Sequence, residues 1–425
     1  MIIKVKMWGT LIGTLSDDGN SIVFTYDKKF INSKIELSPI HMKLSSDSYT
    51  FPNISKKTFK GLPGLFSDSL PDKYGNKIFD DWLACNGKLY EEVSPLELLS
   101  IIGKRGMGAL EYYPNNDKYY AEKINIDDLI ELSNIILEDK KSISIDGSDL
   151  KKLVLVGTSA GGARAKAIVA YNEKKDIFKS GQIDLGPDYD YYIIKFDGIE
   201  NNKDKDKYDT KYSTRIEYAY YLMAKEANIN ISECSQYVKN DKYHFMTKRF
   251  DRFRDRDGNL QKLHMQSLCA LYHLPFEQTR YFSYVQAVKV MNMIGISQRE
   301  IEDFYRRMVF NVIARNQDDH IKNISFLMDK KGKWMLSPFY DVTYAYDPTG
   351  SWTKQHQLLI NGKSDNITKE DLINDGIRMS IKENTIYKII SEVEKTISNW
   401  DEYAKRAHLP KDIADAIKGN FRKIM

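Results

Sequence analysis

The residues with the clearest chemical potential lie in one short polar segment, residues 316–323 (NQDDHIKN). Asp318 and Asn323 have four residues between them, which is the D-x-x-x-x-N spacing of a kinase catalytic loop. In that chemistry the carboxylate accepts the proton of the substrate hydroxyl, and the amide oxygen binds a metal ion on the phosphates. The same spacing also arises by chance in surface loops, because Asp and Asn are common there.

A second carboxylate follows at the position expected for another metal ligand. Residues 324–336 contain two short apolar runs joined by the polar sequence DKKGK, which predicts a β-hairpin. The hairpin would bring Asp341, in the sequence PFYD, to the place of the metal-binding Asp of the kinase D-F-G motif. Upstream, residues 301–313 place apolar side chains at helical spacing, so we expect a packed helix that leads directly to Asp318.

A glycine-rich segment, residues 157–166 (GTSAGGARAK), lies between two apolar runs with strong β propensity. Small residues let backbone N–H groups approach phosphate oxygens, so a strand, a glycine turn and a second strand indicate a loop over a nucleotide. The segment contains neither GxGxxG nor GxxxxGK[ST], which argues against a Rossmann or Walker motif. A plain glycine turn in a hairpin is the structural alternative.

One lysine, Lys195, is embedded in the apolar run of residues 191–196 (YYIIKF). Such a lysine is costly in a strand unless it has a partner. In kinases the equivalent lysine binds phosphate and pairs with a Glu on the following helix. Residues 216–224 predict that helix, and Glu217 lies near its start. Both residues could instead be ordinary surface charges.

Residues 244–252 (HFMTKRFDR) predict a strand that runs into a linker, where a kinase hinge would offer backbone groups to adenine. The glycine-rich loop, the strand lysine, the D-x-x-x-x-N loop and the second Asp therefore occur in the kinase order. Together they predict ATP-dependent phosphoryl transfer. His320 could be a metal ligand of a hydrolase, but no second His stands at ligand spacing. We expect it to order the loop through hydrogen bonds.

Composition limits the class of protein. The chain has 425 residues, 42% hydrophobic and 29% charged, with a net charge of +4 and a pI near 8.5, as in soluble globular proteins with a mild basic excess. The three cysteines, Cys85, Cys234 and Cys269, lie far apart and indicate neither disulfides nor a zinc site. No run approaches the roughly 20 apolar residues of a membrane span, so we predict a cytoplasmic protein with no membrane contact.

Several of these segments resemble the HipA-type toxin kinases. The resemblance extends over most of the chain. It includes RGMGALEY at 105–112, SAGGARAK at 159–166 (close to the family's S-x-G-G-A-R-P-K, with Ala165 where Pro is frequent), RFDR at 249–252, DDHIKN at 318–323 and PFYD at 338–341. It implies an α+β, two-lobed protein-kinase-like fold with a mixed N-terminal lobe and a mainly helical C-terminal lobe. We expect a HipA-like N-terminal subdomain at 1–115, the nucleotide-binding part of the N-lobe at 116–250, and the helical C-lobe at 251–425.

The resemblance also implies an activity and its residues. It implies a serine/threonine protein kinase of a type II toxin–antitoxin pair that uses ATP and Mg²⁺. Asp318 would be the base, with His320 and Lys322 beside it, and Asn323 and Asp341 would hold Mg²⁺. Ser159 would be the autophosphorylation site. The implied ATP contacts are Gly161, Gly162, Ala163, Arg164, Ala165, Lys166, Lys195, Glu217, Lys248, Arg249, Phe250, Tyr340 and Asp341.

Its implied partners are a protein of the translation machinery, with an aminoacyl-tRNA synthetase the expected substrate type, and a HipB-like helix-turn-helix antitoxin. Operator DNA would be contacted mainly through that antitoxin, because this sequence contains no such module. Two alternatives remain open. The chain could be a kinase-fold co-repressor subunit of a DNA-bound toxin–antitoxin complex, or a kinase of a small molecule or lipid.

Overall fold

The computed structural model describes residues 1–85, 87–115, 123–137, 164–199 and 212–424. It groups the chain into two compact units. The first contains Met1–Asp204, Met246–Pro275 and Leu327–Lys333, and the second contains Lys205–Phe245, Phe276–Phe326 and Trp334–Met425. The three-part division expected from the sequence stays a prediction.

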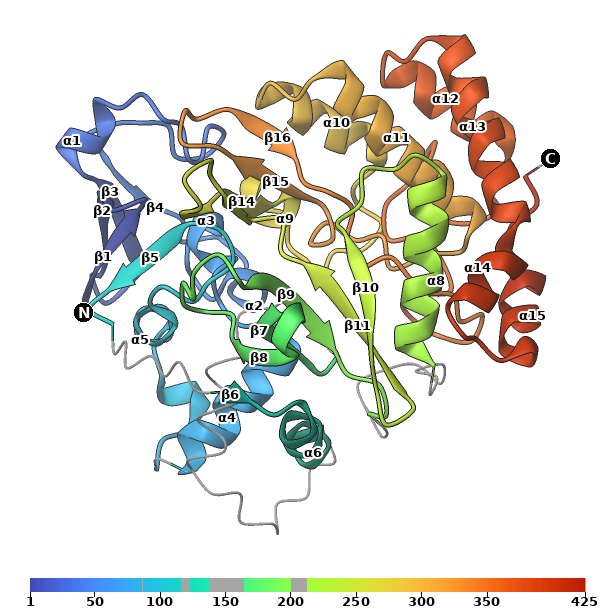
Figure 1. Ribbon diagram of the computed structural model, residues 1–425. Helices are drawn as coiled ribbons and strands as arrows, with labels where there is room; N and C mark the ends of the chain where they lie inside the picture. The colour runs from blue at the N-terminus through green and yellow to red at the C-terminus, as the bar shows by residue number, and fades with distance from the viewer. Residues whose placement is uncertain (86, 116–122, 138–163, 200–211, 425) are drawn as a thin grey trace. The chain divides into compact units, whose positions relative to one another are not determined.

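An antiparallel five-stranded sheet with the order β4-β3-β2-β1-β5 opens the first unit (Figure 1). Side chains alternate along β1, where Ile3, Val5 and Met7 are buried, as expected for a strand with one face against a core. The strands are β1 (Ile2–Met7), β2 (Thr10–Asp17), β3 (Ile22–Tyr26), β4 (Ser48–Thr50) and β5 (Leu110–Tyr113).

Short helices complete this part of the unit. Helix α5 begins with a capping box, in which Ser94 Oγ accepts the Glu97 N–H and the Glu97 carboxylate accepts the Ser94 N–H. The Asp68 carboxylate, just after α3, accepts hydrogen bonds from the N–H and hydroxyl of Ser267. The helices are α1 (Lys28–Ile31), α2 (Lys56–Phe59), α3 (Gly64–Ser67), α4 (Lys73–Cys85), η1 (Tyr90–Glu92) and α5 (Pro95–Ile102).

A second sheet in the first unit contains the predicted Lys195 strand. Its strand order is β9-β7-β8-β6, and the end of β11 joins β9, where the Arg249 N–H is donated to Tyr191 O. The predicted strand that contains Lys195 is confirmed as β9. The elements are β6 (Lys123–Ile124), α6 (Ile126–Leu137), β7 (Lys166–Asn172), η2 (Glu173–Lys175), β8 (Ile177–Ser180), β9 (Asp190–Lys195), β12 (Arg252–Arg254), β13 (Leu260–Lys262), β14 (His264–Ser267) and α9 (Leu268–Leu271).

The second unit is mainly helical, as the sequence predicts. Helix α11 buries the expected apolar face, and α13 packs against both α11 and α12 (Figure 1). Trp400 is fully buried and lies edge-on to Tyr220, with ring centroids 5.6 Å apart. The elements are α8 (Ser213–Glu226), β10 (Cys234–Lys239), β11 (Lys242–Lys248, which ends in the first unit), α10 (Tyr284–Met293), α11 (Gln298–Ile313), β15 (Ser325–Met328, which also ends in the first unit), β16 (Trp334–Leu336), α12 (Lys369–Arg378), α13 (Glu383–Ser398), α14 (Trp400–Arg406) and α15 (Lys411–Gly419).

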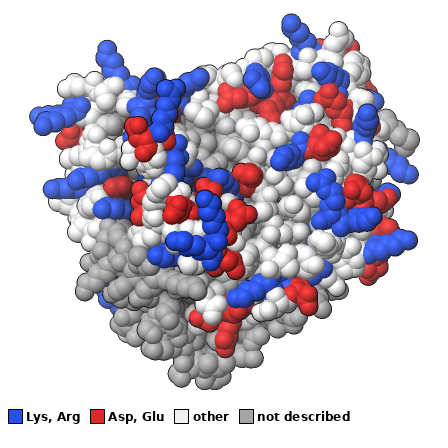
Figure 2. Space-filling view, viewed as in Figure 1, with Lys and Arg blue, Asp and Glu red and all other residues white. Residues whose placement is uncertain are grey.

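Surface charge is mixed. On the face shown in Figure 2, basic and acidic side chains are interspersed, in line with the modest net charge of +4. Among the helices in the described ranges, none combines the length and the apolar character needed to cross a bilayer.

Candidate active site

The predicted catalytic loop follows directly from helix α11. The helix ends at Ile313, and Arg315 then takes a positive φ of 57°, which turns the chain sharply. The loop is pinned on one side by the segment around Ala345, whose carbonyl accepts the Gln317 N–H at 3.0 Å and whose N–H is donated to Arg315 O at 3.1 Å. A sharp turn fastened to a second segment keeps the loop in one conformation.

Asp318 and Asn323, the two ends of the D-x-x-x-x-N sequence, are hydrogen-bonded to each other. The Asn323 side-chain N–H₂ donates to the Asp318 carbonyl at 3.0 Å, and the Asn323 backbone N–H donates to His320 O at 2.9 Å. With its nitrogen engaged, the amide of Asn323 directs its oxygen elsewhere, which suits a metal ligand. The Lys322 N–H donates to His320 Nδ1 at 3.2 Å, so a neutral His320 ring carries its proton on Nε2.

The two neighbouring aspartates have different environments. The Asp318 side chain is 37% exposed, whereas that of Asp319 is 2% exposed. The Asp319 carboxylate accepts hydrogen bonds from Tyr284 Oη at 2.8 Å and from the Gln357 N–H at 2.7 Å, and His356 Nδ1 lies 2.8 Å from it. Burial, together with the negative charge of Asp319, raises the pKa of Tyr284 well above its ordinary value. Asp318 is therefore accessible to a substrate, whereas the buried contacts of Asp319 hold the loop in place.

Asp341 follows the β15–β16 hairpin and lines the same pocket as Asp318 and Asn323. Its φ is 57°, an uncommon conformation for a residue other than glycine and one that often marks a functional position. Ahead of it, the Phe339 N–H donates to Asn230 O at 2.7 Å, and Tyr340 Oη donates to Lys322 O at 2.8 Å. The Tyr340 hydroxyl thus joins the Asp341 segment to the catalytic loop.

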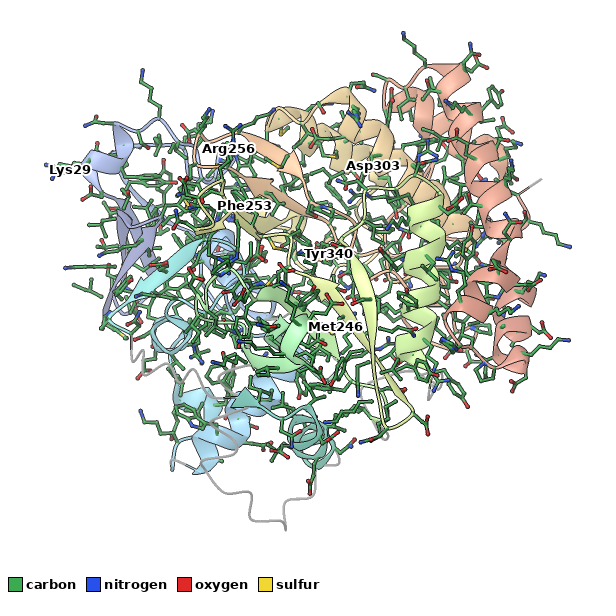
Figure 3. All side chains as sticks on the ribbon, in the orientation of Figure 1. Lys29, Met246, Phe253, Arg256, Asp303 and Tyr340 are labelled. Atoms are coloured by element: carbon green, nitrogen blue, oxygen red, sulfur yellow. The ribbon has the colours of Figure 1, made fainter. Side chains whose placement is uncertain are left out.

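Helix α11 also holds this segment through an arginine. Arg307 is buried, donates to Ser337 O at 2.8 Å, and pairs with Asp303 at 2.7 Å. Burial lowers the pKa of Arg307, although the nearby Asp303 charge opposes that effect. Asp303 and Tyr340 are both labelled in Figure 3.

A pocket in the second unit gathers the predicted chemical groups. Its lining includes Asp318, His320, Asn323 and Asp341. No group of three or more His, Cys, Asp and Glu side chains that could hold a metal ion occurs in the described ranges. Asn323 and Asp341 nevertheless offer the amide and carboxylate oxygens that Mg²⁺ prefers, and Mg²⁺ commonly takes its other ligands from phosphates and water. The donor set fits a nucleotide-bound Mg²⁺.

In the first unit, the predicted phosphate-binding lysines occupy paired positions on two neighbouring strands. Lys166 on β7 pairs directly with Lys195 on β9, and both side chains are buried. Two cations at paired strand positions would together attract an anion such as phosphate. Arg164 and Ala165 precede β7, whereas Ser159, Gly161, Gly162 and Ala163 lie outside the described residues. Glu217 is buried on α8 of the second unit, so its pairing with Lys195 stays a prediction.

Two of the predicted hinge residues, Lys248 and Arg249, are bonded to other groups of the protein. The Arg249 N–H is donated within the sheet to Tyr191 O at 2.8 Å, and its guanidinium binds the Asp251 carboxylate at 2.7 and 2.9 Å. Lys248 forms an ion pair with Asp190 at 3.2 Å. An adenine contact by the N–H of Arg249 would therefore compete with a sheet hydrogen bond, while contacts by Lys248 and Phe250 stay predictions.

Asp251 also joins the hinge to a glycine loop far away in the sequence. Its carboxylate accepts the Gly108 N–H at 2.7 Å and binds Arg252 at 2.8 Å. Burial disfavours the charged form, but the guanidinium groups of Arg249 and Arg252 outweigh it and hold the pKa of Asp251 well below its ordinary value. The RFDR and RGMG sequences therefore form one structural cluster.

Comparison with known families is consistent with this geometry. Residues 158–400 match the family model described as HipA-like C-terminal domain, and residues 3–113 match the HipA N-terminal domain. The chain belongs to the HipA family. The match to the C-terminal domain of HipA proteins contains the whole pocket, including Asp318, Asn323 and Asp341, and the resemblance noted in the sequence is confirmed.

A HipA protein of known structure has the same fold. The chain superposes on HipA from the Shewanella oneidensis MR-1 toxin–antitoxin system, solved with HipB and its operator DNA, with a TM-score of 0.69 and 16% identity. The superposition covers 98% of this chain and 94% of that chain. It confirms the predicted α+β, kinase-like fold class. A Helicobacter pylori proinflammatory kinase, CtkA, matches with a TM-score of only 0.34 and 14% identity, over 55% of this chain and 88% of that chain.

One curated relative of this HipA-family chain is named as a putative kinase, Y4mE of Sinorhizobium fredii. The two are 28% identical over 144 residues, which is 32% of this chain. The chain spans only about a third (33%) of the length of that relative.

Sequence reasoning missed four residues around the site of this HipA-family chain. Tyr284, Trp352, His356 and Gln357 all contact Asp318 or Asp319. They lie 34 to 38 residues from the aspartates along the chain, and no spacing rule connects them. The only local signal was a histidine, His356, in the polar run of residues 353–357.

Proposed function

We propose that this HipA-family protein is an ATP-dependent serine/threonine protein kinase. The observation that supports it best is that Asp318, Asn323 and Asp341 line one pocket in the second unit. These are the three side chains that the D-x-x-x-x-N and second-Asp spacing predicted for phosphoryl transfer. A co-repressor without catalysis would not need all three.

In the proposed reaction, Asp318 accepts the proton of the acceptor hydroxyl while the hydroxyl oxygen forms a bond to the γ-phosphorus. The bond between that phosphorus and the β–γ bridging oxygen breaks, and ADP leaves. The partial exposure of Asp318 allows an acceptor to reach it. His320 would direct its Nε2–H to the transferred phosphoryl group, and Lys322 would add positive charge in the same loop.

Asn323 and Asp341 would hold Mg²⁺, which neutralises charge on the phosphates when bound. The close ties between their segments, from Tyr340 to Lys322 and from Asn323 to Asp318, would keep these two ligands at a constant separation. A separation that is fixed before the metal binds reduces the loss of entropy that metal binding must offset.

The first unit would bind ATP. The glycine-rich loop, from Gly161 and Gly162 through Ala163, Arg164 and Ala165 to Lys166, would cover the phosphates, and Lys195 would contact them and pair with Glu217. Burial of both Lys166 and Lys195 on opposed strand positions supports this assignment. Lys248, Arg249 and Phe250 would form the hinge beside adenine, and Tyr340 would lie near the nucleotide.

We place the kinase in a toxin–antitoxin pair. Membership of the HipA family and the similarity in fold to HipA of the Shewanella complex, which contains HipB and operator DNA, support a HipB-like helix-turn-helix antitoxin as partner. DNA would be bound mainly through the antitoxin. We propose a translation protein, most simply an aminoacyl-tRNA synthetase, as the substrate, with growth arrest in the cytoplasm as the outcome.

The test measures transfer of labelled γ-phosphate to protein by purified wild-type chain with Mg²⁺ and ATP. Asp318→Asn and Asp341→Asn should each lower the rate about 10²- to 10⁴-fold and should keep the wild-type unfolding temperature within a few degrees. Phosphoproteomics after brief expression would identify the acceptor. Near-normal transfer by a folded Asp318→Asn protein would refute the assignment, and label on a lipid or metabolite alone would favour the small-molecule alternative.

A further inference from the structure

The Asp318 carboxylate has a close contact that the proposed chemistry does not explain. The indole Nε1–H of Trp352 donates to Asp318 Oδ1 at 2.6 Å. Among the residues that the structure describes, His320 Nε2 also lies near this oxygen, at 3.7 Å. Both contacts fall on Oδ1, so Oδ2 is the oxygen left to accept a proton.

Trp352 is itself held firmly. Its carbonyl accepts hydrogen bonds from Arg280 Nη2 at 3.1 Å and from Gln357 Nε2 at 2.7 Å. Its ring packs against Phe276, with the two centroids 5.3 Å apart. An aromatic side chain with a fixed backbone and a ring neighbour has little rotational freedom, so the direction of its N–H is set by the fold.

One of the residues that hold Trp352, Gln357, also holds the predicted catalytic loop. Gln357 donates its backbone N–H to Asp319 Oδ1 at 2.7 Å and its side-chain N–H₂ to Gln317 O at 3.2 Å. Arg280 donates its backbone N–H to Gln357 O at 3.0 Å. Gln357 therefore connects Trp352, the hydrogen-bond donor, to residues 317 and 319, which flank the acceptor Asp318.

We propose that Trp352 is a positioning residue for phosphoryl transfer, which fixes the rotation of the Asp318 carboxylate so that Oδ2 receives the proton of the acceptor hydroxyl. This inference rests on the proposed kinase function. Rotation about the last bond of an Asp side chain is soft, and a charge-assisted hydrogen bond is short and directional. An indole nitrogen donates only, so Trp352 orients the base without competing for the proton.

A kinetic experiment separates positioning from packing. Trp352→Phe keeps an aromatic ring beside Phe276 and removes the N–H. We expect kcat for protein phosphorylation to fall about 10- to 100-fold, while KM for ATP stays within about twofold, because the lost interaction acts on the transition state rather than on nucleotide binding. Trp82→Phe, at a partly buried Trp beside Phe79 in the first unit, is the matched control and should keep wild-type kcat.

The same substitution in the Asp318→Asn background supplies the decisive comparison. If Trp352 acts through Asp318, Trp352→Phe should cause no further loss there, because two residues that act as a unit are not additive. An equal loss in both backgrounds, or wild-type kcat in the single variant, would overturn the proposal.

A spectroscopic measurement tests the contact without any activity. In a ¹H–¹⁵N spectrum, the indole resonance that disappears in Trp352→Phe should be the one that moves upfield in Asp318→Asn, and those of the other tryptophans should stay in place. If wild-type protein transfers no phosphate, the kinase function fails. In that case the spectrum alone tests whether Trp352 orients Asp318. A Trp352 resonance that keeps its position in Asp318→Asn would overturn this inference as well.

Discussion

The Asp319 carboxylate and the His356 imidazole lie 2.8 Å apart (Oδ2 to Nδ1) beneath the catalytic loop, and both side chains are almost completely buried. Asp319 Oδ2 also accepts the Tyr284 hydroxyl, which in turn accepts a hydrogen bond from Asn311 at 3.0 Å. Helices α10 and α11 are thereby linked to residues 356 and 357 through one carboxylate. The network keeps the neighbouring residue, Asp318, at the surface of the pocket.

Loss of that carboxylate should destabilise the protein. Asp319→Ala would leave the buried donors of Tyr284, His356 and Gln357 without their acceptor, so we expect the free energy of unfolding to fall by about 3 kcal/mol. Urea denaturation would measure it. Asp401→Ala is the matched control, because Asp401 is exposed and pairs only with the exposed Lys418 among the residues described, and it should be nearly neutral. Equal stability of the two variants would argue against a structural role for Asp319.

Removal of the strand lysine should weaken nucleotide binding. Lys195→Met replaces a buried cation that is opposed to Lys166, and the loss of a charge-assisted phosphate contact should raise the Kd for ATP about tenfold or more. Calorimetric titration would measure it. Lys179→Met, in the same sheet on β8, should bind ATP normally. An ATP-bound structure with Lys195 directed into solvent would contradict the assignment, as would a missing Lys195–Glu217 contact.

Ser159 should become phosphorylated when the protein is incubated with Mg²⁺ and ATP. A phosphate there adds roughly −1.5 to −2 charges and would pair with a nearby cation, for which Arg164 and Lys166 are candidates. A loop held in this way could not cover ATP, so the phosphorylated protein should bind ATP more weakly. Mass spectrometry would detect the phosphate, with Asp318→Asn as the inactive control. Unphosphorylated Ser159, or unchanged ATP affinity after phosphorylation, would mean that Ser159 only stabilises its turn.

Stability of the first unit should fall on acidification. His273 Nε2 accepts the Gly64 N–H at 3.0 Å, and its ring stacks on His41 with centroids 4.2 Å apart. Burial, with a smaller effect from the charge of His41, lowers the pKa of His273 from 6.5 to about 3. The unfolded chain therefore binds a proton first, so this contribution is complete above about pH 6.5 and is lost as the pH falls toward 3.

Unfolding measured across this pH range would test the linkage. His273→Asn tolerates the positive φ of 52° at this position and should flatten the dependence. His408→Asn is the matched control, because His408 also has a positive φ, of 58°, but is exposed, and it should keep the wild-type dependence. A wild-type slope in His273→Asn would show that other groups account for the acid sensitivity.

The local parts of the site were predictable from the sequence. Asp318 and Asn323 lie within one turn of chain, and Asp341 follows a hairpin whose strands and polar turn are visible as a pattern. Helix α11 was predictable because a buried helix face must repeat its apolar residues at a helical period. These features depend on short-range geometry, which the order of residues determines directly.

The contacts that distinguish one aspartate from the next were decided by the tertiary structure. Trp352 and His356 meet residues 318 and 319 only because the chain after Asp341 folds back across the loop, and Asp251 meets Gly108 from 143 residues away. Such pairs depend on where whole segments pack, and closing a long loop leaves no periodic trace in the sequence. The order of residues was enough to predict the candidate residues for phosphoryl transfer, and the packing decided which of two adjacent carboxylates is exposed, how it is oriented and what holds it there.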